Sequence, residues 1–387
     1  MVYLDNSATA PPLSAAIKEV SRVMRETDWN PSALYRPAID AERIVSGCRE
    51  DLKARLGADH VIFTSGGTEA DNLAIRGAAS RLRKPGTFLF SAAEHAAVLE
   101  QQAALEAIGN AVRIIPLTPD GLVDTVALEA LLTPGTRLIS VMDVSNETGA
   151  VQPIPEIIAL RNKKCPSAMV FVDAAQSFMR MDRTRRLLAS GVDMVSVSAH
   201  KVHGPKGVGA LALATGRRSK LNPVTFGGGQ EDGLRPGTEN VAGIAGFHAA
   251  MIALDECGFN IVDRLRENKL RFLSILAQSM PDVWINGPSP SSDQAAPHIV
   301  NLSTPGIGGE VLVRALEREG VYVGTGSACS SKKKQRSPGF LAMGVQQERA
   351  DRAIRVSLSP LNTAEDMTQA AAAIVRAHHS IYPYRKR

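Results

Sequence analysis

The feature that most constrains the fold is the alternation of short apolar runs with helical patterns through the first two thirds of the chain. Nearly continuous apolar runs occur at 60–65, 86–91, 111–117, 136–144, 168–173, 192–198 and 207–213. Between several of them, as at 68–82 and 94–109, apolar residues recur three and four positions apart, the spacing of an amphipathic helix. Apolar strands that alternate with helices are typical of a mostly parallel sheet covered on both faces. The sequence therefore predicts an α/β domain built on a mostly parallel, seven-stranded sheet.

The pattern changes near residue 240. A helical stretch at about 240–279 comes first, and the apolar runs that follow are sparser, at 298–303, 320–324 and 353–359. We interpret this part as a smaller α+β domain joined through a long helix. The predicted division assigns residues 13–254 to the large domain, and residues 1–12 and 255–387 to the small domain.

Composition argues against several classes of protein. The 387 residues include four cysteines with no CxxC pair, so we expect neither a disulfide framework nor a cysteine-based zinc site. No stretch approaches the roughly 20 apolar residues of a membrane helix. The first residues also lack the pattern of a secretory signal, so we expect no membrane association and a cytoplasmic location. The net charge of +5 is modest and spread out, which does not argue for direct nucleic-acid binding.

Polar residues at the ends of the predicted strands are the first candidates for a site, because open α/β sheets bind ligands beyond the carboxyl ends of their strands. In FTSGGTEADN (63–72), a strand runs into two glycines and a helix starts at once. Gly67 lets the backbone approach a ligand closely, and the free N–H groups and positive dipole of a helix start attract an anion such as phosphate. Thr68 also fits the simpler role of helix N-cap.

The segment VSVSAHKVHGPKGVGAL (195–211) brings Ser198, His200 and Lys201 to the end of another strand. A lysine that is desolvated beside a hydroxyl and an imidazole can have a lowered pKa and form a Schiff base. The alternative is a surface lysine in a loop. His200 and His203 have the spacing of a metal pair, but no third ligand is evident, so we predict no metal site.

Asp173 ends the strongly apolar strand VFVD, where a carboxylate is costly unless a cation pairs with it. A protonated ring nitrogen would be such a cation. An anion site, a buried carboxylate and a Schiff-base lysine together match pyridoxal 5'-phosphate, whose phosphate, ring nitrogen and aldehyde need these three partners. The combination predicts a pyridoxal-phosphate enzyme.

Two further strand exits carry single polar residues. His95 follows the run at 86–91, and Asn146 follows the run at 136–144. A lone histidine is more often structural than catalytic, and an asparagine in a turn often caps its own backbone. For both residues, a structural and a functional role stay open on this evidence.

Ordered motifs extend over nearly the whole chain. They are YLDNSAT (3–9), NPSAL (30–34), FTSGGTEADNLAI (63–75), EHAAVLE (94–100), NETGAVQPI (146–154), DAAQ (173–176), SAHKVHGPKGVGAL (198–211), GGGQEDGLRPGTENVAGIAG (227–246), GSACSS (326–331) and RVSLS (355–359). With these motifs the chain resembles the cysteine desulfurases, pyridoxal-phosphate enzymes of the class V aminotransferase group. The resemblance implies PLP-dependent transferase fold type I and conversion of L-cysteine to L-alanine. GSAC is similar to the motif of the iron–sulfur-cluster-assembly type, which has a long catalytic loop.

The resemblance implies a role for each matching residue around the cofactor ring. Lys201 would condense with the cofactor aldehyde and move the substrate Cα proton. Asp173 would pair with the pyridine nitrogen, and Gln176 would hydrogen-bond the ring hydroxyl. His95 would stack on the ring and handle protons near the substrate thiol.

The resemblance also implies how the phosphate is held. Thr68, Ser198 and His200 would bind it, beside the backbone of Gly67. Thr238 would reach the phosphate bound by the neighbouring subunit, which implies a homodimer with shared active sites.

The substrate side is implied in the same way. Asn146 and Arg355 would bind the carboxylate of L-cysteine, Arg355 through a bidentate pair. Cys329, in a loop of about residues 324–338, would attack the substrate sulfur and carry it as a persulfide. Thiolate is the nucleophilic form of cysteine, and the basic run at 332–336 could depress the pKa of this thiol.

The destination of the sulfur stays open. The expected partner is a sulfur-acceptor protein, either a scaffold for iron–sulfur clusters or a tRNA-thiolation enzyme. Lys332–Lys334 either dock an acidic sulfur acceptor or a thiolated tRNA, or form a solvated segment. The alternatives among enzymes are a selenocysteine lyase or another class V aminotransferase, and the alternative outside enzymes is a sulfur-trafficking scaffold with little catalysis.

Overall fold

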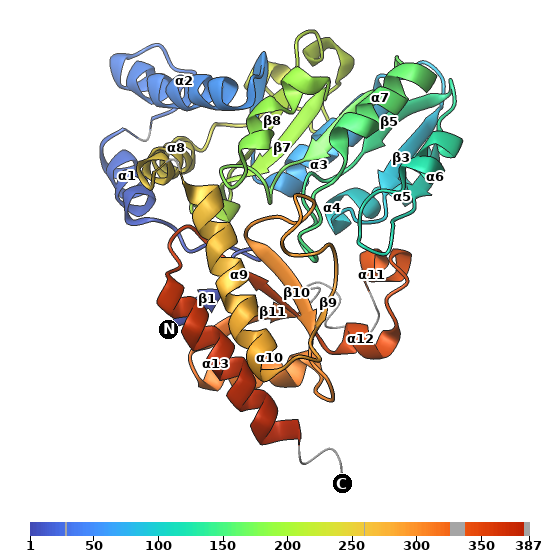
Figure 1. Ribbon diagram of the computed structural model, residues 1–387. Helices are drawn as coiled ribbons and strands as arrows, with labels where there is room; N and C mark the ends of the chain where they lie inside the picture. The colour runs from blue at the N-terminus through green and yellow to red at the C-terminus, as the bar shows by residue number, and fades with distance from the viewer. Residues whose placement is uncertain (28, 259, 326–336, 383–387) are drawn as a thin grey trace.

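A computed structural model describes residues 1–27, 29–258, 260–325 and 337–382. This part of the chain forms two lobes, each built on its own sheet and its own apolar core (Figure 1). Cys329 and Lys332–Lys334 lie outside the described residues.

The first sheet has seven strands in the order β2-β8-β7-β6-β5-β3-β4. Neighbours pair in parallel except at β8, which is antiparallel to both β2 and β7. The strands are β2 (His60–Thr64), β3 (Thr87–Ser91), β4 (Ala111–Ile115), β5 (Thr136–Ser140), β6 (Met169–Asp173), β7 (Met194–Ser198) and β8 (Gly209–Leu213). The predicted mostly parallel, seven-stranded sheet is confirmed, and each predicted run contributes one strand.

Alternate side chains of the strands build a core on each face of this sheet. In β6, Val170 and Val172 lie in one core and Phe171 lies in the other. The first core is covered by α1 (Ser14–Glu26), α2 (Arg36–Leu56), α6 (Thr125–Leu131), α7 (Ile154–Lys164) and α8 (Val241–Glu256). The second is covered by α3 (Gly67–Ser80), α4 (Ala96–Leu99) and α5 (Gln102–Ala107). Cover on both faces explains why most of these strands are apolar throughout.

Some local predictions were wrong. The helical pattern at 94–109 forms the separate helices α4 and α5. The strand predicted at 136–144 ends at Ser140. Most side chains of β4 are not buried, because β4 is an edge strand of the sheet. The long helix at 240–279 is broken, because Gly258 has a φ of 96°, a left-handed conformation that ends a helix.

The second sheet has five strands in the order β1-β11-β12-β10-β9. They are β1 (Val2–Leu4), β9 (Trp284–Ile285), β10 (Ile299–Ser303), β11 (Val321–Thr325) and β12 (Ala353–Ser357). Its core packs against α9 (Ile261–Ser279), α10 (Gly309–Arg318) and α13 (Ala364–Ile381), while α11 (Pro338–Ala342) and α12 (Gln347–Asp351) lie between β11 and β12 in the chain. The predicted domain boundaries at residues 12 and 254 stay predictions.

Strand β12 presents different chemistry on its two faces. Ile354 and Val356 belong to the core of the second lobe, so Arg355 between them faces the other way. In the described part of the chain, no single helix is long and apolar enough to cross a membrane, and α8 and α9 reach that length and composition only as a bent pair.

Candidate active site

One edge of the first sheet gathers the predicted residues. Strands β2, β3, β5, β6 and β7 run in the same direction, so their carboxyl ends lie along one edge, where open α/β sheets bind ligands. The predicted residues that end these strands or follow them are Gly67, Thr68, His95, Asn146, Asp173, Gln176, Ser198, His200 and Lys201.

The start of α3 forms a cradle for an anion. Its N-cap is Gly66, and Thr68 lies in the first turn, so the alternative of Thr68 as the cap was wrong. A Cβ added to Gly67 would lie 3.7 Å from the Ser198 Cβ, so the helix start adjoins the end of β7. A Cβ added to Gly209 would lie 2.6 Å from the Gly66 backbone, so only glycine permits this approach. The buried Ser198 hydroxyl has no hydrogen-bond partner among the described residues, as expected of a group that binds a ligand.

Asp173 and Gln176 come from one turn at the end of β6. Asp173 is buried, and its Oδ1 accepts a hydrogen bond from the Ala175 N–H at 2.8 Å. The buried Gln176 donates from Nε2 to the Ser7 carbonyl at 3.1 Å, and its Oε1 accepts from Arg180 at 3.3 Å. Hydrogen bonds thus fix an acid and an amide that lie three positions apart at the end of one strand.

Lys201 closes the 3-10 turn Ala199–Lys201 that follows β7. Its Nζ donates to the carbonyls of Ser7 and Ala8 at 2.5 and 2.9 Å. Burial lowers the pKa of Lys201 to about 8, and the nearby Arg355 guanidinium acts in the same direction. A substantial fraction of the amine is therefore neutral near physiological pH, which suits a nucleophile and a base.

His95 caps α4, with Nδ1 accepting a hydrogen bond from the Ala97 N–H at 3.2 Å. The proton of the neutral ring is therefore on Nε2. Desolvation lowers the pKa of His95, Asp173 opposes this shift, and Lys201 adds to it. The imidazole is neutral at pH 7, and Nε2 is the atom at which it can exchange a proton.

His200 and His203 are held by other parts of the protein. His200 Nδ1 lies 3.1 Å from Thr9 Oγ1. Both ring nitrogens of His203 are engaged, one by the Pro11 carbonyl at 2.7 Å and one by the Ser359 hydroxyl at 2.9 Å. Desolvation lowers the pKa of each histidine to about 4, so both are neutral at pH 7. Within the described ranges, no three His, Cys, Asp or Glu side chains converge as a metal site would require.

Arg355 and Asn146 come together from the two lobes. Arg355 Nη1 donates to the Asn146 carbonyl at 3.0 Å, and Nη2 lies 2.6 Å from Asp5 Oδ1. The arginine is buried, and its Nε has no partner in the described part of the chain. A guanidinium fixed in this way retains donors for a carboxylate ligand.

The residues that flank the segment containing Cys329 are anchored near this pair. On one side, Gly324 of β11 pairs with Arg355 in the sheet. On the other side, the Ser337 hydroxyl donates to Glu147 Oε2 at 2.6 Å, and Glu147 follows directly after the asparagine that Arg355 contacts. Cys329 itself lies outside the described residues.

Thr238 lies in a loop that does not directly follow a strand of the first sheet. It is exposed, in a surface cavity of about 420 Å³ whose lining includes Glu69 and Arg235. Arg235 Nε donates to Glu69 Oε1 at 2.9 Å, which ties the Thr238 loop to the first turn of α3. Its assignment to a neighbouring subunit stays a prediction.

Two further buried carboxylates lie close to Asp173. The Ser140 hydroxyl donates to Glu94, and the Ser196 hydroxyl donates to Asp71, both at 2.7 Å. Burial, and secondly the Asp173 charge, raise the pKa of Glu94 to about 8, and the same two causes raise the pKa of Asp71 well above its usual range. Glu94 is therefore mostly protonated at pH 7.

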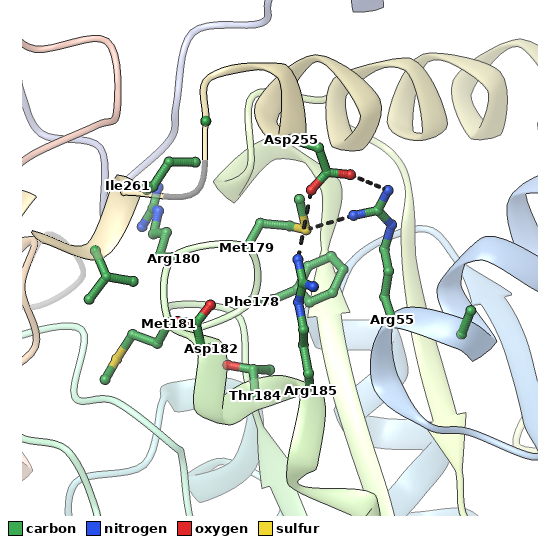
Figure 2. Close-up of a pocket in the computed structure, with 13 residues that line it drawn as sticks. Arg55, Phe178, Met179, Arg180, Met181, Asp182, Thr184, Arg185, Asp255 and Ile261 are labelled. Atoms are coloured by element: carbon green, nitrogen blue, oxygen red, sulfur yellow. Dashed lines mark hydrogen bonds and ion pairs between the residues drawn. The ribbon is translucent and has the colours of Figure 1, made fainter. Parts of the chain in front are cut away.

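A cavity of about 550 Å³ lies elsewhere, where segment 178–185 meets α2 and the start of α9 (Figure 2). Asp255 links two arginines in it, at 2.6 Å from Arg55 and 3.7 Å from Arg185. Arg180 lies at the edge of this cavity, away from that cluster (Figure 2). The lining includes none of the residues predicted for the active site.

Sequence reasoning missed Asp5 and Arg180, which contact the predicted residues Arg355, Gln176 and Lys201. Asp5 follows β1 of the second sheet, and Arg180 lies further from the end of β6 than Gln176 does. The signals available were the acidic residue inside YLDNSAT and the single cation inside the apolar run SFMRM. A lone charge in an apolar run indicates a buried group that needs partners.

The residues at this edge fit pyridoxal phosphate. A helix start with a free buried hydroxyl suits the phosphate, the buried Asp173 suits a protonated ring nitrogen, and Lys201 suits the aldehyde.

Comparisons with known proteins agree. The model of the family "Aminotransferase class-V" matches residues 2–369. Cysteine desulfurase IscS of Dictyoglomus turgidum is 36% identical over 392 residues, which cover 100% of this chain and 97% of the relative. Among solved structures, a NifS-like protein has a TM-score of 0.87 at 30% identity, covering 98% of this chain and 100% of the other. The structure described as SspA in complex with cysteine has a TM-score of 0.79 at 30% identity, and the match covers 94% of this chain and 100% of the other.

The chain therefore belongs to the class V aminotransferases, a family of enzymes that use pyridoxal phosphate. Within that family it is a cysteine desulfurase of the IscS and NifS kind. The predicted family, fold type and cofactor are confirmed.

Proposed function

We propose that this enzyme converts L-cysteine to L-alanine and takes the sulfur as a persulfide on Cys329. The observation that carries the proposal is that Lys201, an amine with a lowered pKa, shares one edge with the Arg355–Asn146 pair. An α-amino acid needs both a base for its Cα proton and a partner for its carboxylate. In the reaction the Cβ–S bond of L-cysteine breaks, an S–S bond to Cys329 forms, and protons return to carbon to give alanine.

Bound pyridoxal phosphate supplies an electron-withdrawing ring that stabilises negative charge at the substrate Cα. The residues that would hold it are Gly67, Thr68, Ser198 and His200 at the phosphate, Asp173 at the ring nitrogen and Gln176 at the ring hydroxyl.

The remaining residues act on the substrate. Arg355 and Asn146 bind its carboxylate and fix the orientation of Cα. Lys201 takes and returns the Cα proton. His95 exchanges a proton at Nε2 with the substrate sulfur, and the Cys329 thiolate attacks that sulfur.

The proposal includes a homodimer with shared sites, in which Thr238 serves the neighbouring subunit. The tie between Arg235 and the start of α3 supports it, because it places the Thr238 loop beside the phosphate cradle at the protein surface. A sulfur-acceptor protein and a cytoplasmic location complete the proposal.

The test is a mass-spectrometric search for a persulfide on Cys329 after addition of L-cysteine, with alanine measured in parallel. We expect the persulfide in the wild type and no sulfur transfer in Cys329→Ser. The control is Cys257→Ser, because Cys257 is a half-buried thiol whose sulfur donates to the Ala253 carbonyl of α8 at 3.5 Å. A Cys329→Ser enzyme that releases alanine at the wild-type rate would refute the persulfide step. Faster turnover of selenocysteine than of cysteine would favour a lyase, and a colourless, inactive protein would favour a scaffold.

A further inference from the structure

Arg180 is a buried cation that has no acidic partner among the described residues. Only 2% of its surface is exposed, and it takes part in none of the ion pairs of the described residues. Other buried arginines do have such partners: Arg161 pairs with Asp193 at 3.1 Å, and Arg355 pairs with Asp5 at 2.6 Å. A buried unpaired charge is strongly destabilising, so its presence calls for an explanation.

The Arg180 guanidinium donates instead to three oxygens of the active site. Nη1 donates to Gln176 Oε1 at 3.3 Å, and Nη2 donates to the Asn6 carbonyl at 3.3 Å and to the Lys201 carbonyl. These oxygens belong to three separate segments: the residues after β1, the turn after β6 and the turn after β7. One side chain therefore joins the three segments that surround the Lys201 amine.

The contact with Arg180 decides which way the Gln176 amide faces. A guanidinium has donors only, so the Gln176 atom that meets it must be the oxygen. On the other side the Ser7 carbonyl can only accept, so the atom that meets it must be the nitrogen. Both neighbours select the same orientation, and one N–H of Nε2 is left for a ligand oxygen.

We propose that Arg180 is a positioning residue of this active site, which orients the Gln176 amide so that it donates to the cofactor ring and holds the backbone of Lys201 in place. The proposal rests on the proposed function, because the ligand that these two residues meet is pyridoxal phosphate.

Arg180 also affects Lys201 through its charge. The charged and titratable groups that act on Lys201 or respond to it are Arg180, Arg355, Asp5, Asp173, His95 and His200. Burial is the main cause of the lowered pKa of Lys201, and the Arg355 and Arg180 charges add to it. Loss of the Arg180 charge should therefore raise the pH at which the lysine linked to the cofactor titrates.

The test uses the wild-type holoenzyme and the Arg180→Met and Arg180→Lys holoenzymes, and follows the visible absorbance of the bound cofactor against pH. We expect the midpoint pH of this absorbance change to rise by about one pH unit in Arg180→Met. In Arg180→Lys, which keeps the charge, it should stay near the wild-type value. The control is Arg185→Met, since Arg185 is exposed and pairs with Asp255. A midpoint in Arg180→Met equal to that of the wild type would overturn the proposal. If Arg180→Met does not fold, Arg180→Gln replaces it, because that amide keeps donors for the oxygens but carries no charge.

A double-mutant cycle tests whether Arg180 affects cofactor binding through the Gln176 amide. We expect Arg180→Met to weaken pyridoxal-phosphate binding about tenfold in the wild type and much less in a Gln176→Ala background. Equal losses in both backgrounds would show that Arg180 does not act through the amide. A wild type that is colourless or makes no alanine would instead contradict the proposed function, so the two failures are distinct.

Discussion

At the scale of single residues, the proposed function makes turnover depend on Lys201. Lys201→Ala should abolish alanine formation, because no other described amine lies at the strand ends with a lowered pKa. Lys206→Ala is the control, since Lys206 is an exposed lysine five residues further along the same loop. Alanine release by Lys201→Ala without an added amine would contradict the role proposed for Lys201.

Glu94 should make the folded protein less stable as the pH rises. Burial, helped by Asp173, raises the pKa of Glu94 to about 8 from the usual 4.5, so between these values the folded state binds more protons than the unfolded state. The Glu94 contribution to the free energy of unfolding is therefore complete below pH 4.5 and falls by up to about 1.4 kcal/mol per pH unit until about pH 8.

Glu94→Gln should remove this slope. Urea unfolding should show similar stability of the variant and the wild type near pH 4.5, and a more stable variant at pH 8. The same substitution at the exposed Glu106 is the control. A difference between Glu94→Gln and the wild type that does not change with pH would show that the folded protein ionises Glu94 normally.

At the scale of elements, the phosphate cradle depends on a contact between two backbones. Gly209→Ala would place a Cβ 2.6 Å from the Gly66 backbone and 2.8 Å from the Val197 carbonyl, so β8 or the start of α3 must move. Overpacking of this kind costs about 1–3 kcal/mol, so we expect pyridoxal phosphate to bind roughly tenfold more weakly or worse. Equilibrium dialysis measures this.

The matched control for Gly209→Ala is Gly47→Ala. Gly47 is an exposed residue in the middle of α2, and a Cβ added to it would meet no atom within 4 Å. This change should leave cofactor affinity unaltered and stabilise the fold by about 0.5–1 kcal/mol. Equal affinities of the two variants would mean that the β8–α3 contact does not shape the cradle.

The elements also show what the sequence can and cannot predict. Strands buried on both faces were predictable because burial leaves a continuous apolar run, and the polar residues that follow them were predictable because they interrupt it. Strands β1 and β9 were missed because three and two residues are too short to show a pattern. Asp5 was missed because its partner Arg355 lies 350 positions away in the chain. Arg180 was missed because one side chain joins partners that lie 4, 21 and 174 positions away, and this convergence exists only in the folded chain.

At the scale of the whole molecule, the proposed homodimer with shared active sites predicts complementation between subunits. In a mixed dimer of Lys201→Ala and Thr238→Ala chains, one site would have both residues intact. Unfolding and refolding the two variants together should therefore give more activity than the sum of the separate samples. Lys201→Ala mixed with a chain that carries both substitutions should give no such gain. Absence of a gain in the first mixture would argue that Thr238 serves its own subunit or no site.

The position of Arg355 on β12 has a consequence for how the substrate is recognised. This arginine belongs to the second lobe, whereas Lys201 belongs to the first, so an amino acid held by both spans the boundary between the lobes. On the proposed function the substrate would therefore contact both lobes, whereas a thiol amine without a carboxylate would contact only the first. In the sequence Cys329 follows β11, which pairs with β12, so the residue that would bind the substrate carboxylate and the residue that would take its sulfur are both attached to the sheet of the second lobe.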